Sequence, residues 1–170
     1  NFNFVVNPLP NIVAIRDTTL CYDKNTIITA TGGVTYQWTP TTYLANPNTA
    51  TTVASPPYPT SILYTVKGTD ANSCYNTDTL RIKFFVKSFI NAGADTSVCL
   101  NPSPFKYRDS VRLNGQGSFV SIFWTPTIGL SNPSIRNPLA KPSSTIDYVF
   151  NGIDTNNCLI KDTVQVMVLD

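Results

Sequence analysis

The chain has 170 residues, a formal net charge of +2 and only 13% charged residues, and it contains neither His nor Glu. The scattered Lys and Arg form no basic patch for nucleic acid, and no apolar run reaches the roughly 20 residues of a membrane-spanning helix. Because Thr, Val, Ile and aromatic residues favour strands and the helix former Glu is missing, the composition predicts an all-β fold.

The sequence contains one unit written twice, and this repeat decides the domain organisation. Trp38-Thr39-Pro40 returns as Trp124-Thr125-Pro126. The other matches are Asp17-Thr18-Thr19-Leu20-Cys21 with Asp95-Thr96-Ser97-Val98-Cys99, Leu44-Ala45-Asn46-Pro47 with Leu130-Ser131-Asn132-Pro133, Tyr64 with Tyr148, Asp70, Asn72 and Cys74 with Asp154, Asn156 and Cys158, and Asp78-Thr79-Leu80 with Asp162-Thr163-Val164. We therefore predict two domains, residues 8–87 and residues 88–170.

In chain order, Asn1–Val6 alternates like a strand and matches the last strands of both repeats. Residues 1–7 are therefore predicted to be the last strand of a preceding repeat, followed by a linker that Pro8 and Pro10 stiffen. The predicted strands of the first repeat are Ile12–Ile15, Thr26–Thr31, Thr35–Trp38, Thr51–Ala54, Leu63–Thr69 and Thr79–Val86, with a turn or one helical turn at Thr41–Pro47.

The second repeat follows the same order after a joint at Phe89–Ala94. Its predicted strands are Ser110–Gly115, Ser121–Trp124, Leu139–Lys141, Asp147–Ile153 and Asp162–Leu169, and the insertion Asn101–Asp109 predicts an extended loop. Six or seven short strands with regular turns in each repeat indicate a β-sandwich.

Four cysteines, two in each repeat, predict disulfides and a compartment outside the reducing cytosol. The sequence alone leaves three pairings open. Because each repeat is expected to close independently, we predict one disulfide in each domain, Cys21–Cys74 and Cys99–Cys158. A zinc site is the alternative, but the chain offers no CxxC and no His.

The combined pattern resembles one family of repeats. The pattern is Asp-Thr-x-x-Cys, aromatic-x-Trp-Thr-Pro, Leu-x-Asn-Pro, Asp-x-Asn-x-Cys and Asp-Thr-hydrophobic, and it covers residues 11–170. It is similar to the immunoglobulin-like or polycystic-kidney-disease-like tandem repeats of large cell-surface proteins that gliding Gram-negative bacteria export by type IX secretion. The resemblance implies an immunoglobulin-like sandwich, an outer-membrane-associated extracellular location and a role in an adhesin or stalk, with neighbouring repeats as partners.

Several aromatic residues have a structural and a binding interpretation. Trp38 and Trp124 could stack on a sugar, but a core tryptophan is the ordinary arrangement in immunoglobulin sandwiches. Tyr64 and Tyr148 are expected to be structural, each with its hydroxyl bonded to the backbone. Tyr43, Tyr58 and Phe119 lie in predicted loops and are candidates for contact with a ligand such as a surface polysaccharide or another surface protein; the alternative is that each covers one end of its sandwich.

Asp70 with Asn72, and Asp154 with Asn156, are weak candidates for a calcium site through oxygen ligands. Each cluster offers only one carboxylate, and Asp and Asn also form turns by bonding their own backbone. No other metal or cofactor is expected.

Hydroxyl residues that follow an aspartate resemble the general O-glycosylation motif of the same bacterial group. The candidate hydroxyls are Thr18, Thr79, Ser110 and Thr163. The alternative is that Asp and Thr begin strands.

The sequence predicts no catalysis, because it has no His or Glu for acid-base chemistry and no Gly-x-Ser-x-Gly. It predicts no phosphate-binding loop, no nucleic-acid partner and no membrane insertion. The expected function is that of structural or adhesive repeat modules. The alternatives are a carbohydrate-binding module beside a secreted enzyme and a docking module of a secretion or motility complex.

Overall fold

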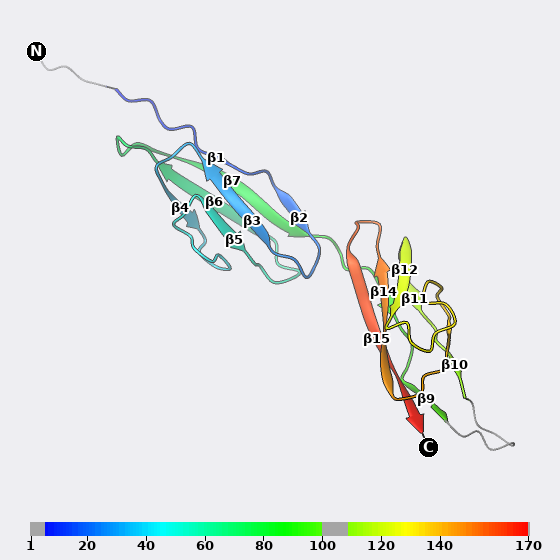
Figure 1. Ribbon diagram of the computed structural model, residues 1–170. Helices are drawn as coiled ribbons and strands as arrows, with labels where there is room; N and C mark the ends of the chain where they lie inside the picture. Colours follow the sequence, from blue (N-terminus) through cyan, green and yellow to red (C-terminus); the bar gives the residue numbers. More distant parts are fainter. Residues whose placement is uncertain (1–5, 100–108, 170) are drawn as a thin grey trace, which may run out of the picture. The chain divides into compact units, whose positions relative to one another are not determined.

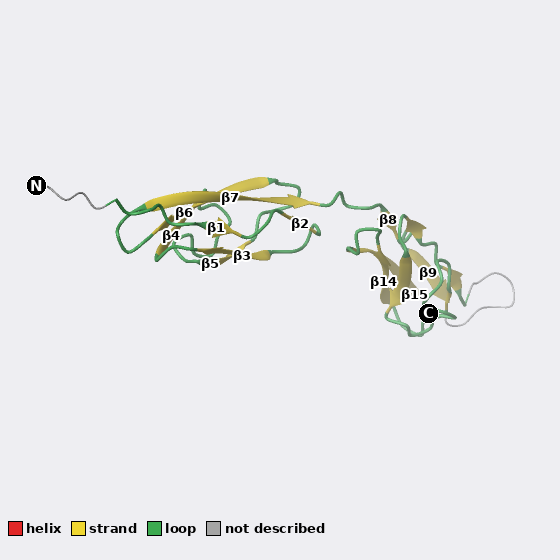
Figure 2. Cartoon of the chain, turned by 90° about the horizontal axis from the view of Figure 1, so that it is seen from above, coloured by secondary structure: helices red, strands yellow, loops and turns green. Residues whose placement is uncertain are grey.

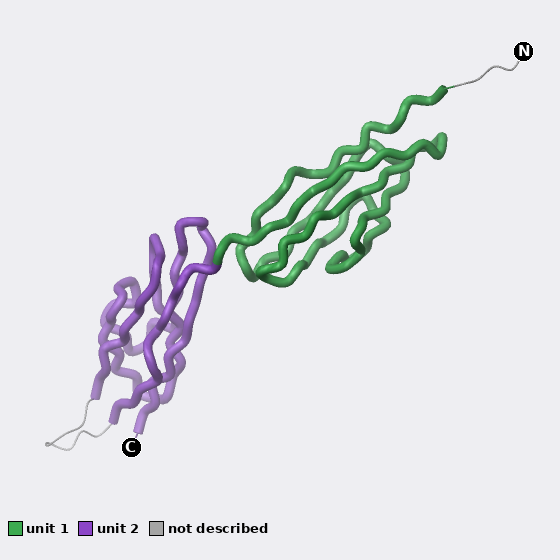
Figure 3. Tube along the Cα trace, turned by 180° about the vertical axis from the view of Figure 1, so that it is seen from behind, with its two compact units in different colours: residues 1–86 green, residues 87–170 purple. Residues whose placement is uncertain are grey.

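A computed structural model describes residues 6–99 and 109–169. The chain divides into two compact units, Asn1–Val86 and Lys87–Asp170, each with its own core (Figure 3). The described residues contain strands and turns but no helix. Most of the predicted strand Asn1–Val6 and of the predicted loop Asn101–Asp109 lies outside the described residues.

The first unit is a sandwich of two sheets (Figures 1 and 2). One sheet has the order β1-β3-β5 and the other β2-β7-β6-β4. The strands are β1 Val13–Ala14, β2 Thr18–Leu20, β3 Thr26–Thr31, β4 Thr35–Thr39, β5 Thr51–Ala54, β6 Ile62–Thr69 and β7 Tyr75–Phe84. All pairs are antiparallel except β2 with β7, which is parallel.

The second unit repeats this arrangement with one interruption. The sheet β12-β14-β15-β9 has the same connectivity as β4-β6-β7-β2, including the parallel pair β9 with β15. The facing strands form two short pairs, β10 with β13 and β11 with β8. The bounds are β8 Ile90–Asn91, β9 Thr96–Cys99, β10 Val111–Arg112, β11 Gln116–Gly117, β12 Ser121–Thr125, β13 Leu139–Ala140, β14 Ile146–Ile153 and β15 Leu159–Leu169.

Within the strand expected at Ser110–Gly115 the structure has only β10, and β11 begins one residue after the predicted end. The residues between them hydrogen-bond to the segment before β13, because Leu113 N donates to Pro138 O and Gly115 N to Arg136 O. The short strands β2 and β9 were not among the predicted strands.

Alternation along each strand places one face in the core. In β6 and β14 the large apolar residues on that face are Tyr64 and Val66, and Tyr148 and Phe150. Each core gathers these residues with a fully buried tryptophan and with apolar residues of the facing sheet. The repeat of the sequence is thus a repeat of the core.

Candidate functional site

The residues that recur in both repeats are used in the same way in both units. Trp38 and Trp124 are fully buried, and each indole nitrogen donates to a backbone carbonyl, of Thr49 at 2.9 Å and of Ile135 at 3.0 Å. Both tryptophans are therefore core residues that fix the loop after their strand, as the structural interpretation expected. A buried indole face offers nothing for a sugar to stack on.

Tyr64 and Tyr148 hold the same loops from the other side. The Tyr64 hydroxyl donates to Thr42 O at 2.8 Å, and the Tyr148 hydroxyl donates to Ile128 O at 2.6 Å. Burial raises the pKa of Tyr64 to about 12, with a contribution from the neighbouring Tyr43, and burial also raises the pKa of Tyr148. Both tyrosines stay protonated as donors, in agreement with the predicted structural role.

The calcium candidates lie in two turns of the same geometry. Asp70 Oδ1 accepts from Asn72 N at 2.8 Å and Cys74 N at 2.9 Å. Asp154 Oδ1 accepts from Asn156 N and Cys158 N at the same two distances. One carboxylate oxygen of each turn is thus engaged by the loop's own amides. Among the described residues no group of three or more His, Cys, Asp or Glu side chains is placed to hold a metal ion, and calcium binding stays a prediction.

Asp154 is more deeply engaged than Asp70. Its Oδ2 also accepts from Ser88 Oγ at 2.9 Å, and its side chain is almost fully buried. Burial alone would raise the pKa of Asp154, but the hydrogen bonds from Cys158, Ser88 and Asn156 together outweigh burial and lower it. Sequence reasoning missed Ser88, because no residue of the first repeat plays the same part.

Two further pairs of aspartates brace the sandwich. Asp78 Oδ2 accepts from Ala14 N of β1 at 2.8 Å, and Asp162 Oδ2 accepts from Ala92 N, the residue after β8, at 2.9 Å, so each holds the first segment of its unit against the opposite sheet. A second pair of aspartates lies just before the strands β2 and β9. Asp17 Oδ1 accepts from Arg81 N, and Asp95 Oδ1 accepts from Gln165 N. These motif aspartates are structural acceptors.

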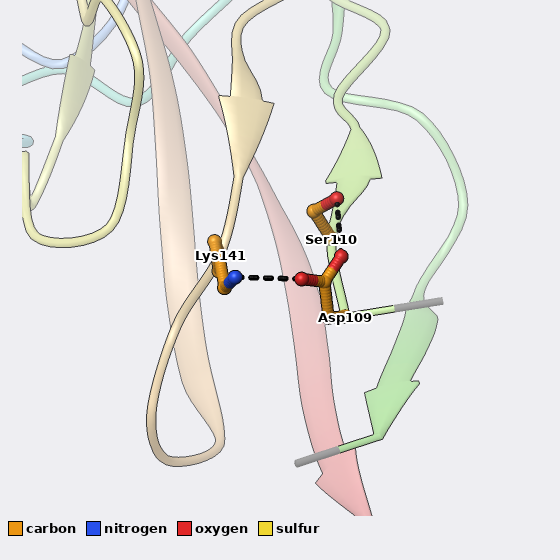
Figure 4. A network of polar contacts seen from close by, with 3 residues as sticks. All are labelled: Asp109, Ser110 and Lys141. Atoms are coloured by element: carbon orange, nitrogen blue, oxygen red, sulfur yellow. Dashed lines mark hydrogen bonds and ion pairs between the residues drawn. The ribbon is translucent and has the colours of Figure 1, made fainter. Parts of the chain in front are cut away.

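The glycosylation candidates lie on or beside these braced strands. Thr79 and Thr163 are exposed at matching positions of β7 and β15, whereas Thr18 is half-buried. Ser110 Oγ donates to Asp109 Oδ1 at 3.0 Å (Figure 4), while Asp109 Oδ2 accepts from Lys141 Nζ at 2.6 Å. These two hydrogen bonds, that of Lys141 first, hold the pKa of Asp109 below its ordinary value. Modification of the four hydroxyls stays a prediction.

The candidate ligand-contact aromatics are divided between the two units. Phe119 belongs to the second unit, is half-buried, and packs edge-to-face on Phe150 at 5.4 Å between ring centroids. Tyr58 belongs to the first unit and makes edge contacts with the rings of Tyr22 at 6.2 Å and Phe84 at 5.8 Å. Tyr43 is 43% exposed. Two of the three therefore pack on other rings of their own unit.

The cysteines depart from the predicted pairing. The structure has Cys21 and Cys158 disulfide-bonded, and Cys74 and Cys99 as free cysteines. The predicted bonds Cys21–Cys74 and Cys99–Cys158 are therefore not formed. The physical reason is the strand order, which places the two cysteines of each unit at opposite ends of one long strand.

Comparison with known proteins adds little to this geometry. No protein-family model matches the chain, and no curated protein matches it. Among solved structures, the insect immune protein hemolin, described with implications for homophilic adhesion, is 11% identical over 99% of this chain and 49% of its own, with a TM-score of 0.42.

Two cadherin structures are similarly distant. Mouse cadherin-23 EC22–24 is 13% identical over 95% of this chain and 65% of its own, with a TM-score of 0.37. Protocadherin gamma B7 extracellular cadherin domains 1–4 are 12% identical over 91% of this chain and 48% of their own, with a TM-score of 0.32. The chain spans about half the length of hemolin and of this protocadherin fragment. At such scores the likeness carries no argument about function. Separately, the described residues hold no helix long and apolar enough to cross a membrane.

Proposed function

We propose that the two units are structural modules of a long cell-surface protein, an adhesin or stalk, in which repeated sandwiches extend the chain. One observation carries this proposal. The recurring polar and aromatic residues have structural roles. Both tryptophans, both tyrosines and three pairs of aspartates form hydrogen bonds that hold loops or strands of their own unit in place. The residues that recur in both repeats are therefore those that maintain the fold of the unit.

At one position of the central strands, in contrast, the two copies differ. Lys67 of β6 lies over the ring of Tyr75 at 4.1 Å, whereas its counterpart Asn151 is buried and donates to Phe123 O, Val149 O and Thr125 Oγ1. A shared ligand site would need shared exposed residues. We therefore propose a non-catalytic role without a cofactor.

The finer assignment rests on the resemblance of the motifs alone. It proposes a location outside the outer membrane of a Gram-negative bacterium, export by type IX secretion and a link to gliding motility. The proposed partners are neighbouring repeats, with surface polysaccharide or other surface proteins as further contacts.

The first experiment tests location and size. An antibody raised against residues 1–170 is applied to intact cells, membranes and medium, with and without protease treatment of the cells, and a periplasmic protein serves as the control for leakage. A very large, protease-sensitive band on intact cells is the expected result. A modest band released into the medium contradicts the proposal and favours an accessory module beside a secreted enzyme.

A second experiment separates a spacer from a binding site. In the native protein, residues 8–168 are replaced by two unrelated β-sandwich domains of similar length. A spacer role predicts that surface display and attachment of the cells to a substratum are retained. Loss of attachment with normal display would show that these repeats themselves carry the adhesive contact.

A further inference from the structure

A hollow of unit 1 lies between two loops at the same end of its sandwich. The first loop, residues 21–25, joins β2 to β3, and the second, residues 55–61, joins β5 to β6. Thr26 at the start of β3 pairs with Ala54 at the end of β5, so the two loops lie side by side where they join the sheet. The hollow between them has a volume of about 280 Å³. Its lining comes entirely from unit 1 and consists of Tyr22, Asp23, Lys24, Asn25, Ser55, Pro56, Pro57 and Tyr58.

Both loops are held in shape by their own backbone. Lys24 N donates to Cys21 O at 3.0 Å, and Thr60 N donates to Pro57 O at 2.8 Å, so a turn closes each loop. Pro56 is buried and anchors the start of the second loop. Because the loops are already ordered, a ligand that binds between them pays little conformational entropy to order them.

Two tyrosine rings form the apolar part of the hollow. Tyr58 makes edge contacts with Tyr22, at 6.2 Å between ring centroids, and with Phe84, at 5.8 Å. These contacts fix the orientation of the Tyr58 ring, yet 38% of the residue stays exposed. Packing on neighbouring rings therefore positions this tyrosine at the surface, where a rigid ring offers contact area at a low entropy cost.

Polar side chains surround the two rings. Lys24 Nζ lies 3.1 Å from Asp23 Oδ2, and these side chains are 60% and 45% exposed. An ion pair so exposed contributes little to stability. The ammonium and the carboxylate both have more hydrogen-bonding capacity than one contact uses. The amide of Asn25 and the hydroxyl of Ser55, which are also exposed, add further donors and acceptors.

Unit 2 closes the corresponding place with an ion pair. Lys141 Nζ donates to Asp109 Oδ2 at 2.6 Å (Figure 4). By the register of the facing strands, these two residues occupy the positions of Ser55 and Lys24 in unit 1. In unit 1 Lys24 pairs instead with its neighbour Asp23, and the space between the loops is open as the hollow.

The aromatic residues are also specific to unit 1. The loop of residues 55–61 is longer than its counterpart, residues 141–145, which contains no aromatic residue. Phe84, which supports Tyr58, is matched by Val168, because each follows the same register with its parallel neighbour. Since unit 2 forms the same sandwich without these rings, the fold itself does not require the hollow.

We propose that this hollow binds a neutral saccharide, with a sugar ring against Tyr22 and Tyr58 and its hydroxyl groups on the surrounding polar side chains. A sugar ring carries C–H groups on its faces and hydroxyl groups around its rim, and the hollow presents apolar and polar surface in the same order. Ligand hydroxyls can donate to the Asp23 carboxylate, accept from the Lys24 ammonium, and do both with the Asn25 amide. A volume close to the lower limit of small-molecule sites, about 300 Å³, suits one or two sugar rings.

The charges of the lining favour a neutral ligand over an ion. The lining holds one carboxylate and one ammonium, and they pair with each other. An anionic group would meet Asp23 and a cationic group would meet Lys24, whereas hydroxyl groups can use both. Such a site gives the proposed polysaccharide contact a defined place, and it rests on the proposed function only for the source of its ligand.

Binding is tested with the purified chain of 170 residues. The neutral probes are maltohexaose, cellohexaose, laminarihexaose and mannohexaose, and an oligogalacturonate is the acidic probe. Amide chemical shifts of the isotope-labelled protein are followed during each titration. We expect saturable shift changes with at least one neutral probe, concentrated at residues 22–25 and 55–58. Shift changes only elsewhere, or none with any neutral probe, would overturn the proposal, and equally tight binding of the acidic probe would overturn the assignment to a neutral ligand.

Two variants place the ligand in the hollow. Tyr58→Ala should weaken binding at least about tenfold, because it removes the apolar contact of the ring. Since Tyr58 also packs on Tyr22 and Phe84, the amide spectrum of this variant is compared with that of the parent to check its fold. Asn25→Ala changes an exposed amide and should weaken binding roughly three- to tenfold through the loss of a hydrogen bond. Parent affinity in both variants would contradict the proposed site.

The matched control is Tyr75→Ala. Tyr75 is another exposed tyrosine of unit 1, at 56%, but it begins β7, whereas Phe84 ends that strand, and it does not line the hollow. This variant is expected to bind with the affinity of the parent, and a loss equal to that of Tyr58→Ala would overturn the proposal. Binding to the purified chain and display on cells are measured separately, so the saccharide site and the cell-surface role can each fail without the other.

Discussion

The two units share the hydrogen bonds of their recurring tryptophans, tyrosines and aspartates but fill the space beside the tryptophan differently. In unit 1 the residue opposite Trp38 is Val66, and in unit 2 the residue opposite Trp124 is Phe150. Phe150 stacks on Trp124 with ring centroids 4.6 Å apart. The larger side chain in unit 2 needs space that unit 1 does not provide.

A glycine in the facing sheet supplies that space. Ala30 of unit 1 pairs with Ala14, and by continuation of the register Gly115 occupies the same place in unit 2. A Cβ on Gly115 would lie 2.5 Å from Phe150 Cζ. The pair Ala30 and Val66 in unit 1 and the pair Gly115 and Phe150 in unit 2 thus fill the same space in two ways. The two units keep the hydrogen bonds of their recurring residues more closely than they keep the identity of their core residues.

The largest expected effect comes from removing the residue that both units share. Trp38→Ala and Trp124→Ala should each cost about 3–5 kcal/mol of their own unit's stability, because a fully buried ring and its indole hydrogen bond are lost. The loss should be larger for Trp124, since aromatic stacking contributes about 0.5–1.5 kcal/mol beyond burial. Hydrogen exchange read by mass spectrometry follows each unit separately. Equal losses in the two units would contradict the distinction.

Exchanging one residue of either packing pair should destabilise its unit, and exchanging both residues should recover part of that stability. Gly115→Ala is expected to cost about 1–3 kcal/mol through overpacking against Phe150, and Val66→Phe a similar amount in unit 1. The pairs Gly115→Ala with Phe150→Val, and Val66→Phe with Ala30→Gly, should each cost less than the sum of their single changes. Denaturant unfolding of the singles and doubles gives the coupling, and strict additivity would refute the compensation.

The third comparison concerns the matched turns. Asp154→Ala should cost about 1–3 kcal/mol, because it leaves the amide of Cys158, a residue 2% exposed, without its acceptor and also removes the bond to Ser88. Asp70→Ala should cost less, since Cys74 is only half-buried and Asp70 has no counterpart of the Ser88 bond. Denaturant unfolding of the two variants beside the parent compares the losses, and an equal or larger loss for Asp70→Ala would contradict this order.

A buried contribution to the pH dependence of unit 2 follows from the lowered pKa of Asp154, beside that of the exposed Asp109. A carboxyl whose folded pKa lies below its unfolded value of about 3.9 stabilises the fold above that pH. That stability is lost as the pH falls through the folded pKa. Acid unfolding followed by hydrogen exchange should show a larger loss in the parent chain than in Asp154→Ala. Identical acid profiles would contradict the assignment.

The sequence predicted the repeat, the strands that carry the core and the buried role of both tryptophans, because these follow from local pattern and alternation. It did not predict β2 and β9, since three or four residues beside a cysteine have no periodicity of their own. Nor could it predict the cysteine states. Spacing along the chain says that Cys21 and Cys74 share a repeat, but only the parallel pairing of β2 with β7 puts them at opposite ends. The aspartates were noticed as a motif, yet their partners lie about 60–70 residues away, which only the fold reveals.

The smallest expected effect lies in the loop after the tryptophan strand. Tyr43 has a φ of 66°, and its counterpart Gly129 has a φ of 74°, so both backbones are in the left-handed region. This region costs a residue with a side chain about 1–2 kcal/mol, and glycine avoids that cost but has more freedom to lose on folding. Tyr43→Gly should therefore stabilise unit 1 slightly, by about 0.5 kcal/mol, whereas Gly129→Ala should destabilise unit 2, because its Cβ would lie 2.8 Å from Lys141 O. Thermal unfolding of the two variants beside the parent measures both signs. If Tyr43→Gly instead destabilises unit 1, the tyrosine side chain contributes contacts that outweigh its backbone strain, and the two loops are not equivalent.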